Sequence, residues 1–144
     1  MVDVNMIWNE FKPGKRVMIV GGGYIGLEVA AVARETNLDV TLVEAEDRIL
    51  KRVACCQTGN FFKNLHETNG VKIIEGQSIA RLTGNNNIFD RAVLASGEEI
   101  WADFAVIGIG AQPSIRLAKA SGIKIKQNIE IGKGRIIREG EDLA

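Results

Sequence analysis

A glycine-rich turn between two apolar runs is the feature that most constrains how this 144-residue chain can fold. The first run, residues 16–20, has the continuous apolar character of a strand buried in a parallel sheet. Residues 24–36 follow with the spacing of a helix that packs on one face, and residues 39–44 form a second strand-like run. Strand, glycine turn, helix and strand within about 30 residues predict a βαβ unit that binds a dinucleotide.

Three glycines of this turn have the spacing Gly-x-Gly-x-x-Gly, and each is expected to have its own physical role. Gly21 lets the backbone turn tightly, Gly23 leaves room for a pyrophosphate, and Gly26 lets the helix pack closely on the strand. The first amides of the helix have no intrahelical acceptor and lie at the positive end of the helix dipole. A phosphate group can therefore bind there without a lysine or an arginine.

The second strand-like run ends in an acid that is expected to select the cofactor. Glu44 lies 18 residues after Gly26, close to the spacing of about 20 for the acid that bonds a ribose. A carboxylate there accepts hydrogen bonds from ribose hydroxyls and repels a 2′-phosphate, which favours NADH over NADPH. Arg48 and Arg52 follow closely and could instead attract a 2′-phosphate, and Glu44 could be an ordinary exposed carboxylate.

Charge and hydropathy exclude several classes of function. Lys and Arg together number 18, as do Asp and Glu, and no basic stripe is present, which argues against nucleic-acid binding. No apolar run reaches the roughly 18 residues of a membrane span, and the mixed N-terminus does not resemble a secretory signal. We therefore expect a cytoplasmic protein without nucleic-acid or membrane partners.

The cysteines and the single histidine indicate no metal site. Cys55 and Cys56 are adjacent, so they form neither an unstrained disulfide nor a Cys-x-x-Cys pair, and we expect reduced thiols in the first turn of a helix. His66 is the only histidine, and it is expected to be a surface or packing residue of that helix. With so few ligands of the right type, a metal centre is not expected.

The rest of the chain predicts an α/β fold, namely a Rossmann-like parallel sheet with helices plus an antiparallel β-meander insertion. The turns Gly84–Asn87 and Ser96–Gly97 separate short strand-like pieces of the kind found in hairpins. The predicted elements are a helix at 55–68, strands at 71–75, 78–82, 88–94, 99–101 and 104–110, and a short helix at 115–120.

Two side-chain expectations follow from these elements. Phe61, Phe62 and Leu65 share one face of the helix at 55–68 and are expected to belong to the core. Gly108, Ile109 and Gly110 follow a buried strand, so they lie where an α/β sheet binds its ligand. The glycines there would let the backbone approach the nicotinamide half of the dinucleotide, although a simple exit from the strand would look the same.

Taken together, the motifs resemble the NADH-binding domain of FAD-dependent pyridine nucleotide–disulfide oxidoreductases. Within that family they are most similar to the ferredoxin and rubredoxin reductases, including the reductase components of aromatic-ring dioxygenases. The motifs that carry the resemblance are residues 21–30, 43–45, 61–62, 65–66, 70–71, 102–103, 106–110 and Pro113.

The resemblance implies cofactors, partners and site residues. NADH would reduce an FAD held on parts absent from this chain, and electrons would pass to an iron–sulfur acceptor such as a ferredoxin or rubredoxin. Tyr24 and Ile25 would face the pyrophosphate and nicotinamide, and Arg52 would lie near the adenosine end. Glu28 would lie near the nicotinamide amide, although it could simply be a solvated helix residue. Gly108 and Gly110 would form the nicotinamide-side loop.

The resemblance also implies a division of the chain. We expect a lead-in at 1–14 and the NADH-binding domain at 15–122, and residues 123–144 are either a C-terminal tail or a remnant of the link back to an FAD domain. The first eleven residues hold no glycine and so no FAD-binding glycine motif, and Ser114 replaces a common asparagine. We expect an excised domain of a longer enzyme rather than a naturally isolated one.

Two other functions are compatible with the same pocket. A stand-alone dinucleotide sensor or interaction module would bind NADH without redox chemistry. A dehydrogenase with its own catalytic acid would need a His, Lys or Tyr positioned at the nicotinamide. The expected place of His66, on the second helix and away from the cofactor, disfavours the dehydrogenase.

Overall fold

The computed structural model describes residues 7–86, 88–110, 114–123, 131–132 and 135–136. The chain divides into two compact units, Met1–Ile109 and Gly110–Ala144, and each is described by itself. The first unit contains the glycine turn and both apolar cores. Pro113, one of the motif residues of the sequence, lies outside the described residues.

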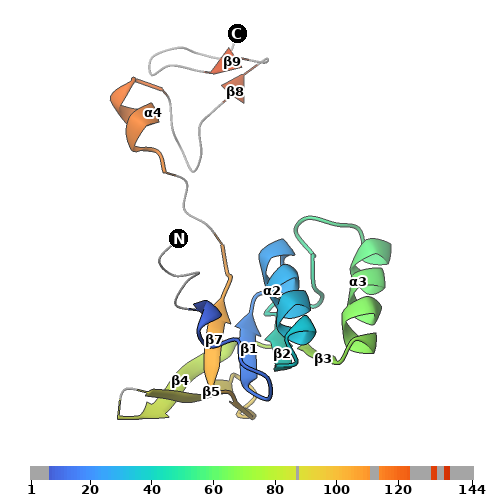
Figure 1. Ribbon diagram of the computed structural model, residues 1–144. Helices are drawn as coiled ribbons and strands as arrows, with labels where there is room; N and C mark the ends of the chain where they lie inside the picture. Colours follow the sequence, from blue (N-terminus) through green and yellow to red (C-terminus); the bar gives the residue numbers. More distant parts are fainter. Residues whose placement is uncertain (1–6, 87, 111–113, 124–130, 133–134, 137–144) are drawn as a thin grey trace. The chain divides into compact units, whose positions relative to one another are not determined.

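A four-stranded parallel sheet forms the centre of the first unit (Figure 1). Its strands are β1 (Arg16–Val20), β2 (Asp39–Val43), β3 (Val71–Ile74) and β7 (Phe104–Ile107), in the order β3-β2-β1-β7. All three pairings are parallel. From β1 the chain adds β2 and β3 on one side, and it then returns to add β7 on the other side of β1. The strand order therefore changes direction at β1, and the ligand of an open α/β sheet binds at such a switch point.

Helices cover one face of this sheet. Helix α2 (Tyr24–Glu35) connects β1 to β2, and α3 (Cys56–Thr68) lies between β2 and β3. Side chains alternate between the faces of a strand, so Val17 and Ile19 of β1 point towards the helices while Met18 points away. The core on the helix side consists of Val17, Ile19, Leu27, Ala30, Ala33, Leu38, Val40, Leu42, Ile49, Leu50 and Val71.

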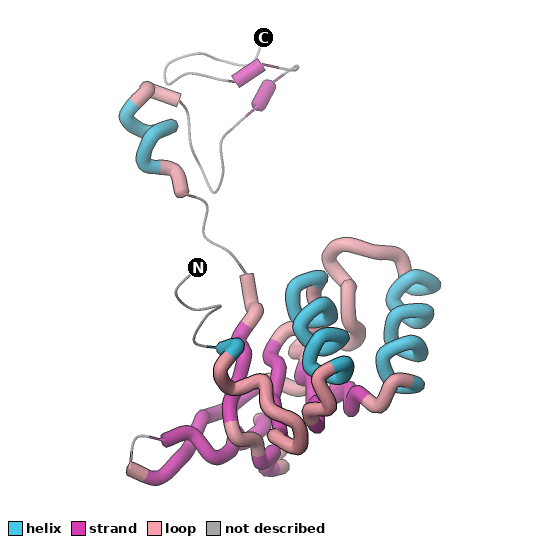
Figure 2. Tube along the Cα trace, in the orientation of Figure 1, coloured by secondary structure: helices cyan, strands magenta, loops and turns pink. Residues whose placement is uncertain are grey.

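An antiparallel meander covers the other face of the sheet. It consists of β4 (Ile79–Asn85), β5 (Ile88–Leu94) and β6 (Glu99–Trp101), in that order. Figures 1 and 2 show it apart from α2 and α3. Its inward side chains pack against Met18 of β1 and Val43 of β2, and the second core consists of Met18, Val43, Ala92, Leu94, Ile100 and Ala102. The predicted α/β class with a β-meander is therefore confirmed, and β4 extends three residues beyond its predicted end.

The ends of α2 follow from local backbone chemistry. Gly23 is the N-cap in an extended conformation, and the helix ends at Glu35 with Thr36 as the C-cap. Asn37 then adopts φ +62°, a left-handed conformation that Asn tolerates better than most residues. The helix predicted at 24–36 is therefore confirmed, with its end one residue earlier than predicted.

The predicted apolar face of α3 is partly wrong. Phe61 is 62% exposed and Leu65 is 45% exposed, whereas Phe62 packs against the helix-side core. Gly59, Phe62 and His66 share the i, i+3, i+7 spacing of a single helical face, and this is the face turned towards the sheet. Phe61 and Leu65 lie four residues apart on the neighbouring face.

The described part of the predicted lead-in, residues 7–14, is packed into the first unit. Phe11 packs against the helix-side core, with its ring centroid 5.8 Å from that of Phe104 in β7. Lys15 pairs with Glu10, and the main-chain N–H of Arg16 donates to Asp103 over 2.7 Å. The guanidinium of Arg16 also lies 2.9 Å from Asp103, and its hydrogen bonds lower the pKa of that carboxyl.

The second unit contains the short helix α4 (Arg116–Ala120) and one antiparallel pair, β8 (Ile131–Gly132) with β9 (Arg135–Ile136). The sequence predicted the helix but not the strand pair. Across the part of the chain that the structure describes, every helix is too short or too polar to cross a lipid bilayer.

Candidate functional site

The glycine turn is built so closely that two of its glycines have no room for a side chain. Gly21 has φ +106°, and a Cβ there would lie 2.6 Å from the carbonyl oxygen of Gly108. A Cβ on Gly26 would lie 1.9 Å from the carbonyl oxygen of Gly21. The turn is fixed between strands because the Gly21 N–H donates to Val43 over 2.8 Å. These contacts explain the tight turn and the close helix packing that the motif predicts.

Gly23 differs, because a Cβ there would meet no atom within 4 Å. Its φ of −82° is accessible to any residue. A Cβ at Gly23 would therefore clash with no protein atom and would only occupy the open space in front of this residue. That space borders the N-terminus of α2, where a pyrophosphate is expected.

Four successive main-chain amides, those of residues 23–26, lie next to this space at the N-terminus of α2. Gly21 and Gly22 donate to protein oxygens, and the first N–H that joins the helical hydrogen-bond series is that of Leu27, which donates to Gly23 over 3.1 Å. Among the described residues, no acceptor lies within hydrogen-bonding reach of the amides of residues 23–26. Free amides at a helix N-terminus form a ready site for a phosphate group.

Glu44 lies beside this turn and holds it. One carboxylate oxygen accepts the Gly22 N–H over 2.6 Å, and the other accepts the Glu46 N–H over 2.8 Å. The side chain is half-buried. An ionised carboxylate has about four acceptor positions, so it can hold both amides and still accept hydrogen bonds from ribose hydroxyls.

The two arginines that follow Glu44 differ in their availability. Arg48 donates to three main-chain oxygens, those of Ile49, Lys51 and Ala54, over 3.2, 3.3 and 2.8 Å. Its guanidinium is therefore used within its own loop. Arg52 is 80% exposed at its side chain and makes one long contact of 3.5 Å with Glu46. Of the two, Arg52 is the one free to turn towards a nucleotide.

The remaining predicted residues of the turn lie on the first turns of α2. Tyr24 is 58% exposed and Ile25 is 62% exposed, both next to the free amides. Glu28 is exposed one helical turn further on. The positions of Tyr24 and Ile25 are compatible with contacts to a bound dinucleotide.

The strand end after β7 brings Gly108 next to the turn. Its N–H donates to Val20 over 2.8 Å, and a Cβ on it would lie 4.0 Å from the Gly26 nitrogen. Ile109 follows with 73% of its surface exposed. Gly110 adopts φ +139°, and it belongs to the second unit. Residue 108, after β7, is thus brought next to the end of β1 at residue 20, to the turn at residue 21 and to the first turn of α2 at residue 26.

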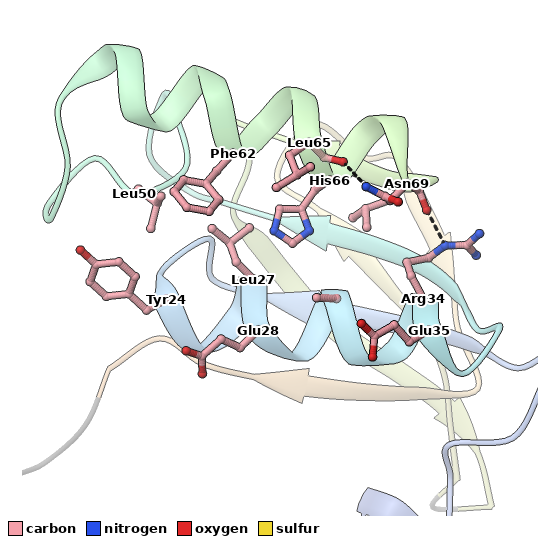
Figure 3. A pocket seen from close by; sticks show the side chains of 12 residues that line it. Tyr24, Leu27, Glu28, Arg34, Glu35, Leu50, Phe62, Leu65, His66 and Asn69 are labelled. Carbon is pink, nitrogen blue, oxygen red and sulfur yellow. Dashed lines mark hydrogen bonds between the residues drawn. The ribbon is translucent and has the colours of Figure 1, made fainter.

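A pocket of about 570 Å³ lies between α2 and α3, beside the turn rather than over it (Figure 3). Tyr24 and Glu28 line its end nearest the turn, and Leu27 and Phe62 form apolar walls. His66 is 8% exposed, and burial lowers its pKa. The free amides, not this pocket, mark the candidate dinucleotide site, because the ligand of such a sheet lies at the strand ends.

Sequence reasoning missed two contacts that hold the turn. Gly22 donates to Glu44, and its carbonyl accepts the Leu50 N–H over 2.9 Å. A Cβ on Gly22 would lie 2.6 Å from the Ile49 side chain. The run of three glycines was a signal for Gly22, because only two belong to the motif. Ile49 and Leu50 stood out as the apolar anchor of a polar loop, but nothing local indicated that Leu50 would bind Gly22.

The two cysteines lie where the sequence predicted them. Cys55 is the N-cap of α3 and Cys56 its first residue, and both are free and exposed. The Thr58 hydroxyl, followed by main-chain amides, lowers the pKa of the Cys55 thiol. In the described part of the chain, no three His, Cys, Asp or Glu side chains gather as a metal site.

Comparison with curated proteins gives relatives of two kinds. The chain is 41% identical to a monodehydroascorbate reductase of Arabidopsis thaliana, over 80% of this chain and 24% of that protein. It is 36% identical to the ferredoxin–NAD(+) reductase component of a biphenyl dioxygenase system from Paraburkholderia xenovorans, over 90% of this chain and 31% of that protein. A rubredoxin–NAD(+) reductase of Ectopseudomonas oleovorans is 32% identical, over 91% and 34%. The chain thus spans about a quarter to a third of the length of these relatives.

Solved structures and a family model agree with this result. A putidaredoxin reductase, crystallised in covalent complex with putidaredoxin, matches with a TM-score of 0.84 at 32% identity, over 92% of this chain and 32% of that chain. The resemblance read from the sequence is confirmed. Residues 2–133 match the model for pyridine nucleotide-disulphide oxidoreductases, and the chain therefore belongs to this family of flavoprotein oxidoreductases.

Proposed function

We propose that this chain is the NADH-binding domain, at about residues 15–122, of a flavoprotein that passes reducing equivalents from NADH to FAD. The observation that carries the proposal is that the four amides of residues 23–26, next to the open space at Gly23, make no hydrogen bond to a described residue. In such an enzyme the nicotinamide supplies a hydride to the flavin. This chain would contribute binding and orientation, with FAD held on other parts of the protein.

Each part of the dinucleotide has a counterpart among the described residues. The free amides and the dipole of α2 would stabilise the pyrophosphate. Glu44 would accept the adenosine ribose hydroxyls, with Arg52 near the adenosine. Tyr24, Ile25 and Glu28 would border the nicotinamide half, with the loop at residues 108–110.

The proposed preference for NADH rests on Glu44 and on the use of Arg48. The negatively charged 2′-phosphate of NADPH would lie next to the negatively charged carboxylate of Glu44, and the two charges would repel each other. The guanidinium of Arg48 already donates to three main-chain oxygens. Of the two arginines, only Arg52 could then offset this repulsion by pairing with the 2′-phosphate. The balance favours NADH.

Titration of NADH and NADPH into the 144-residue chain tests this proposal. Wild type should bind NADH more tightly than NADPH. Glu44→Ala should weaken NADH by about tenfold or more, the cost of a lost hydrogen bond to a charged group, and should reduce the preference. Asp47→Ala is the matched control, because it removes one negative charge from the same loop while leaving the Gly22 contact intact.

Each outcome separates one part of the proposal. Tighter binding of NADPH by wild type would refute the cofactor assignment. Absence of binding to either nucleotide would refute the function. Equal effects of Glu44→Ala and Asp47→Ala would show that only net charge matters.

The electron acceptor is a second proposal that depends on the whole enzyme. We propose an iron–sulfur protein of the ferredoxin or rubredoxin kind, supported by the named partners of the biphenyl dioxygenase and rubredoxin reductases. The monodehydroascorbate reductases among the relatives favour a small organic radical as the second candidate. Reduction of each acceptor by the full-length flavoprotein distinguishes the two, since only the true acceptor should be reduced at high kcat/KM.

A further inference from the structure

The loop between β2 and α3 is held by hydrogen bonds at two places, to the glycine turn and to the carboxylate of Glu75. We call residues 45–54 the docking loop. On the turn side, the Leu50 N–H donates to the Gly22 carbonyl over 2.9 Å, and the Ile49 side chain packs where a Cβ of Gly22 would be. On the opposite side, the Ile49 N–H donates to Glu75 over 2.8 Å.

Glu75 is well placed to fix this loop. It follows β3, its side chain is 15% exposed, and its second oxygen pairs with Lys63 of α3. Ile49 is fully buried with Glu75 in place, so in the intact protein Glu75 and not water is the acceptor of its N–H. A buried donor without an acceptor is costly, and the loop would have to move to satisfy it.

The backbone at Leu50 shows that the loop is held in a demanding conformation. Leu50 has φ +55° and is 3% exposed, although a leucine rarely adopts the left-handed region. Such a conformation persists only where surrounding contacts hold it. The contacts here are the Leu50 N–H to Gly22 and the adjacent Ile49 N–H to Glu75.

We propose that Glu75 is a positioning residue for the dinucleotide site, acting through Ile49 and Leu50 on Gly22. Gly22 directly precedes the four free amides, so its position sets where they point. Glu75 touches no ligand in this scheme. The inference rests on the function proposed above, because it concerns the same phosphate site.

The test compares four chains of 144 residues by NADH affinity, thermal midpoint and amide hydrogen exchange. Glu75→Ala removes the acceptor of the Ile49 N–H and should raise Kd for NADH by about tenfold. Glu75→Gln keeps an oxygen acceptor and should recover most of that affinity. Lys63→Ala breaks the ion pair alone and should leave Kd within about twofold.

Comparing Kd for NADH with the thermal midpoint shows whether Glu75 positions the binding site or only stabilises the fold. Both Glu75→Ala and Lys63→Ala should lower the thermal midpoint, but only Glu75→Ala should raise Kd. In the absence of ligand, Glu75→Ala should also speed exchange of the Leu50 and Gly22 amides, while strand β1 stays protected. If Glu75→Ala does not fold, Glu75→Asp replaces it, because a shorter side chain keeps the charge and withdraws the acceptor.

Other outcomes overturn the inference. If Glu75→Ala, or Glu75→Asp in its place, binds NADH as wild type does, Glu75 does not position the site. If Lys63→Ala weakens binding equally, the effect is one of general stability. If wild type itself binds no NADH, the proposed function fails first, and this inference fails with it.

Discussion

The glycines of the turn share one residue type but differ in what a side chain would meet. At Gly21 and Gly26 the added atom would collide with main-chain oxygens, whereas at Gly23 it would enter open space. The first two are therefore required by the fold itself. Gly23 is required only if something else occupies the space in front of it.

Substitutions at these glycines should separate folding from binding. Gly23→Val should cost no more than about 1 kcal/mol of stability, the scale of an N-cap change, yet block NADH. Gly26→Ala should destabilise the chain by about 1–3 kcal/mol or more, because its Cβ overlaps the Gly21 carbonyl. Chemical denaturation and NADH titration of both variants check this. Normal NADH binding by Gly23→Val would contradict it.

Helix α3 illustrates how an element is oriented by few contacts. A Cβ on Gly59 would lie 3.0 Å from the Arg48 guanidinium and 3.2 Å from the Ile49 carbonyl, so the glycine lets α3 approach the docking loop. Phe62 and His66 continue this face along the helix. Phe61 and Leu65, which are equally suited to burial, remain exposed.

His66 should make the stability of the protein depend on pH. Burial lowers its pKa below the ordinary 6.5, so the unfolded chain binds more protons in the window below 6.5. Stability should therefore be complete above about pH 6.5 and fall as pH decreases, by at most about 1.4 kcal/mol per pH unit for one proton.

Urea denaturation between pH 5 and 8 measures this effect. His66 is the only histidine of the chain, so His66→Gln should flatten the profile between pH 5 and 6.5. Gln57→Ala, on the exposed side of α3, should leave the slope unchanged. An unchanged slope in His66→Gln would show that the histidine is not responsible.

At the scale of the whole chain, the proposed nucleotide site lies in the first unit, beside its parallel sheet. Both faces of the parallel sheet are covered, one by α2 and α3 and the other by the meander. The chain spans about a third of the putidaredoxin reductase that it matches. Hydride transfer requires an acceptor held close and oriented at the nicotinamide.

We therefore expect the 144-residue chain to bind NADH and to show no turnover. Purified chain mixed with NADH and a dye acceptor should oxidise NADH no faster than buffer does. Addition of free FAD should not give activity either, because we propose that FAD is held by other parts of the enzyme. NADH-dependent dye reduction by the flavin-free chain would refute this expectation.

The order of elements was predictable because its signals are local. Alternation and apolar runs marked the strands, and Asn37 marked the end of α2 through its own φ preference. The glycine spacing with Glu44 predicted the turn, since a tight turn and a close helix approach constrain residue type directly. The family resemblance added the branch of reductases, which the comparisons confirmed.

The attachments between distant segments were not predictable in this way. Glu75 reaches Ile49 from 26 positions along the chain, and Glu44 reaches Gly22 from 22 positions. Neither contact leaves a periodicity or a residue preference at its two ends. The buried face of α3 was misjudged for the same reason. The phenylalanines at 61 and 62 are equally apolar, and the face that contains Phe62 is buried because Gly59, on that same face, packs against the docking loop.

Local backbone preferences and hydrophobic periodicity thus set the strands, helices and glycine turn of this protein directly from its sequence. Folding in three dimensions decided that Arg48 is bound to main-chain oxygens, that Glu44 holds the turn, and that Leu50 adopts a left-handed conformation. The physical reason is that a hydrogen bond depends on where two groups meet in space, and chain closure, not composition, brings these groups together.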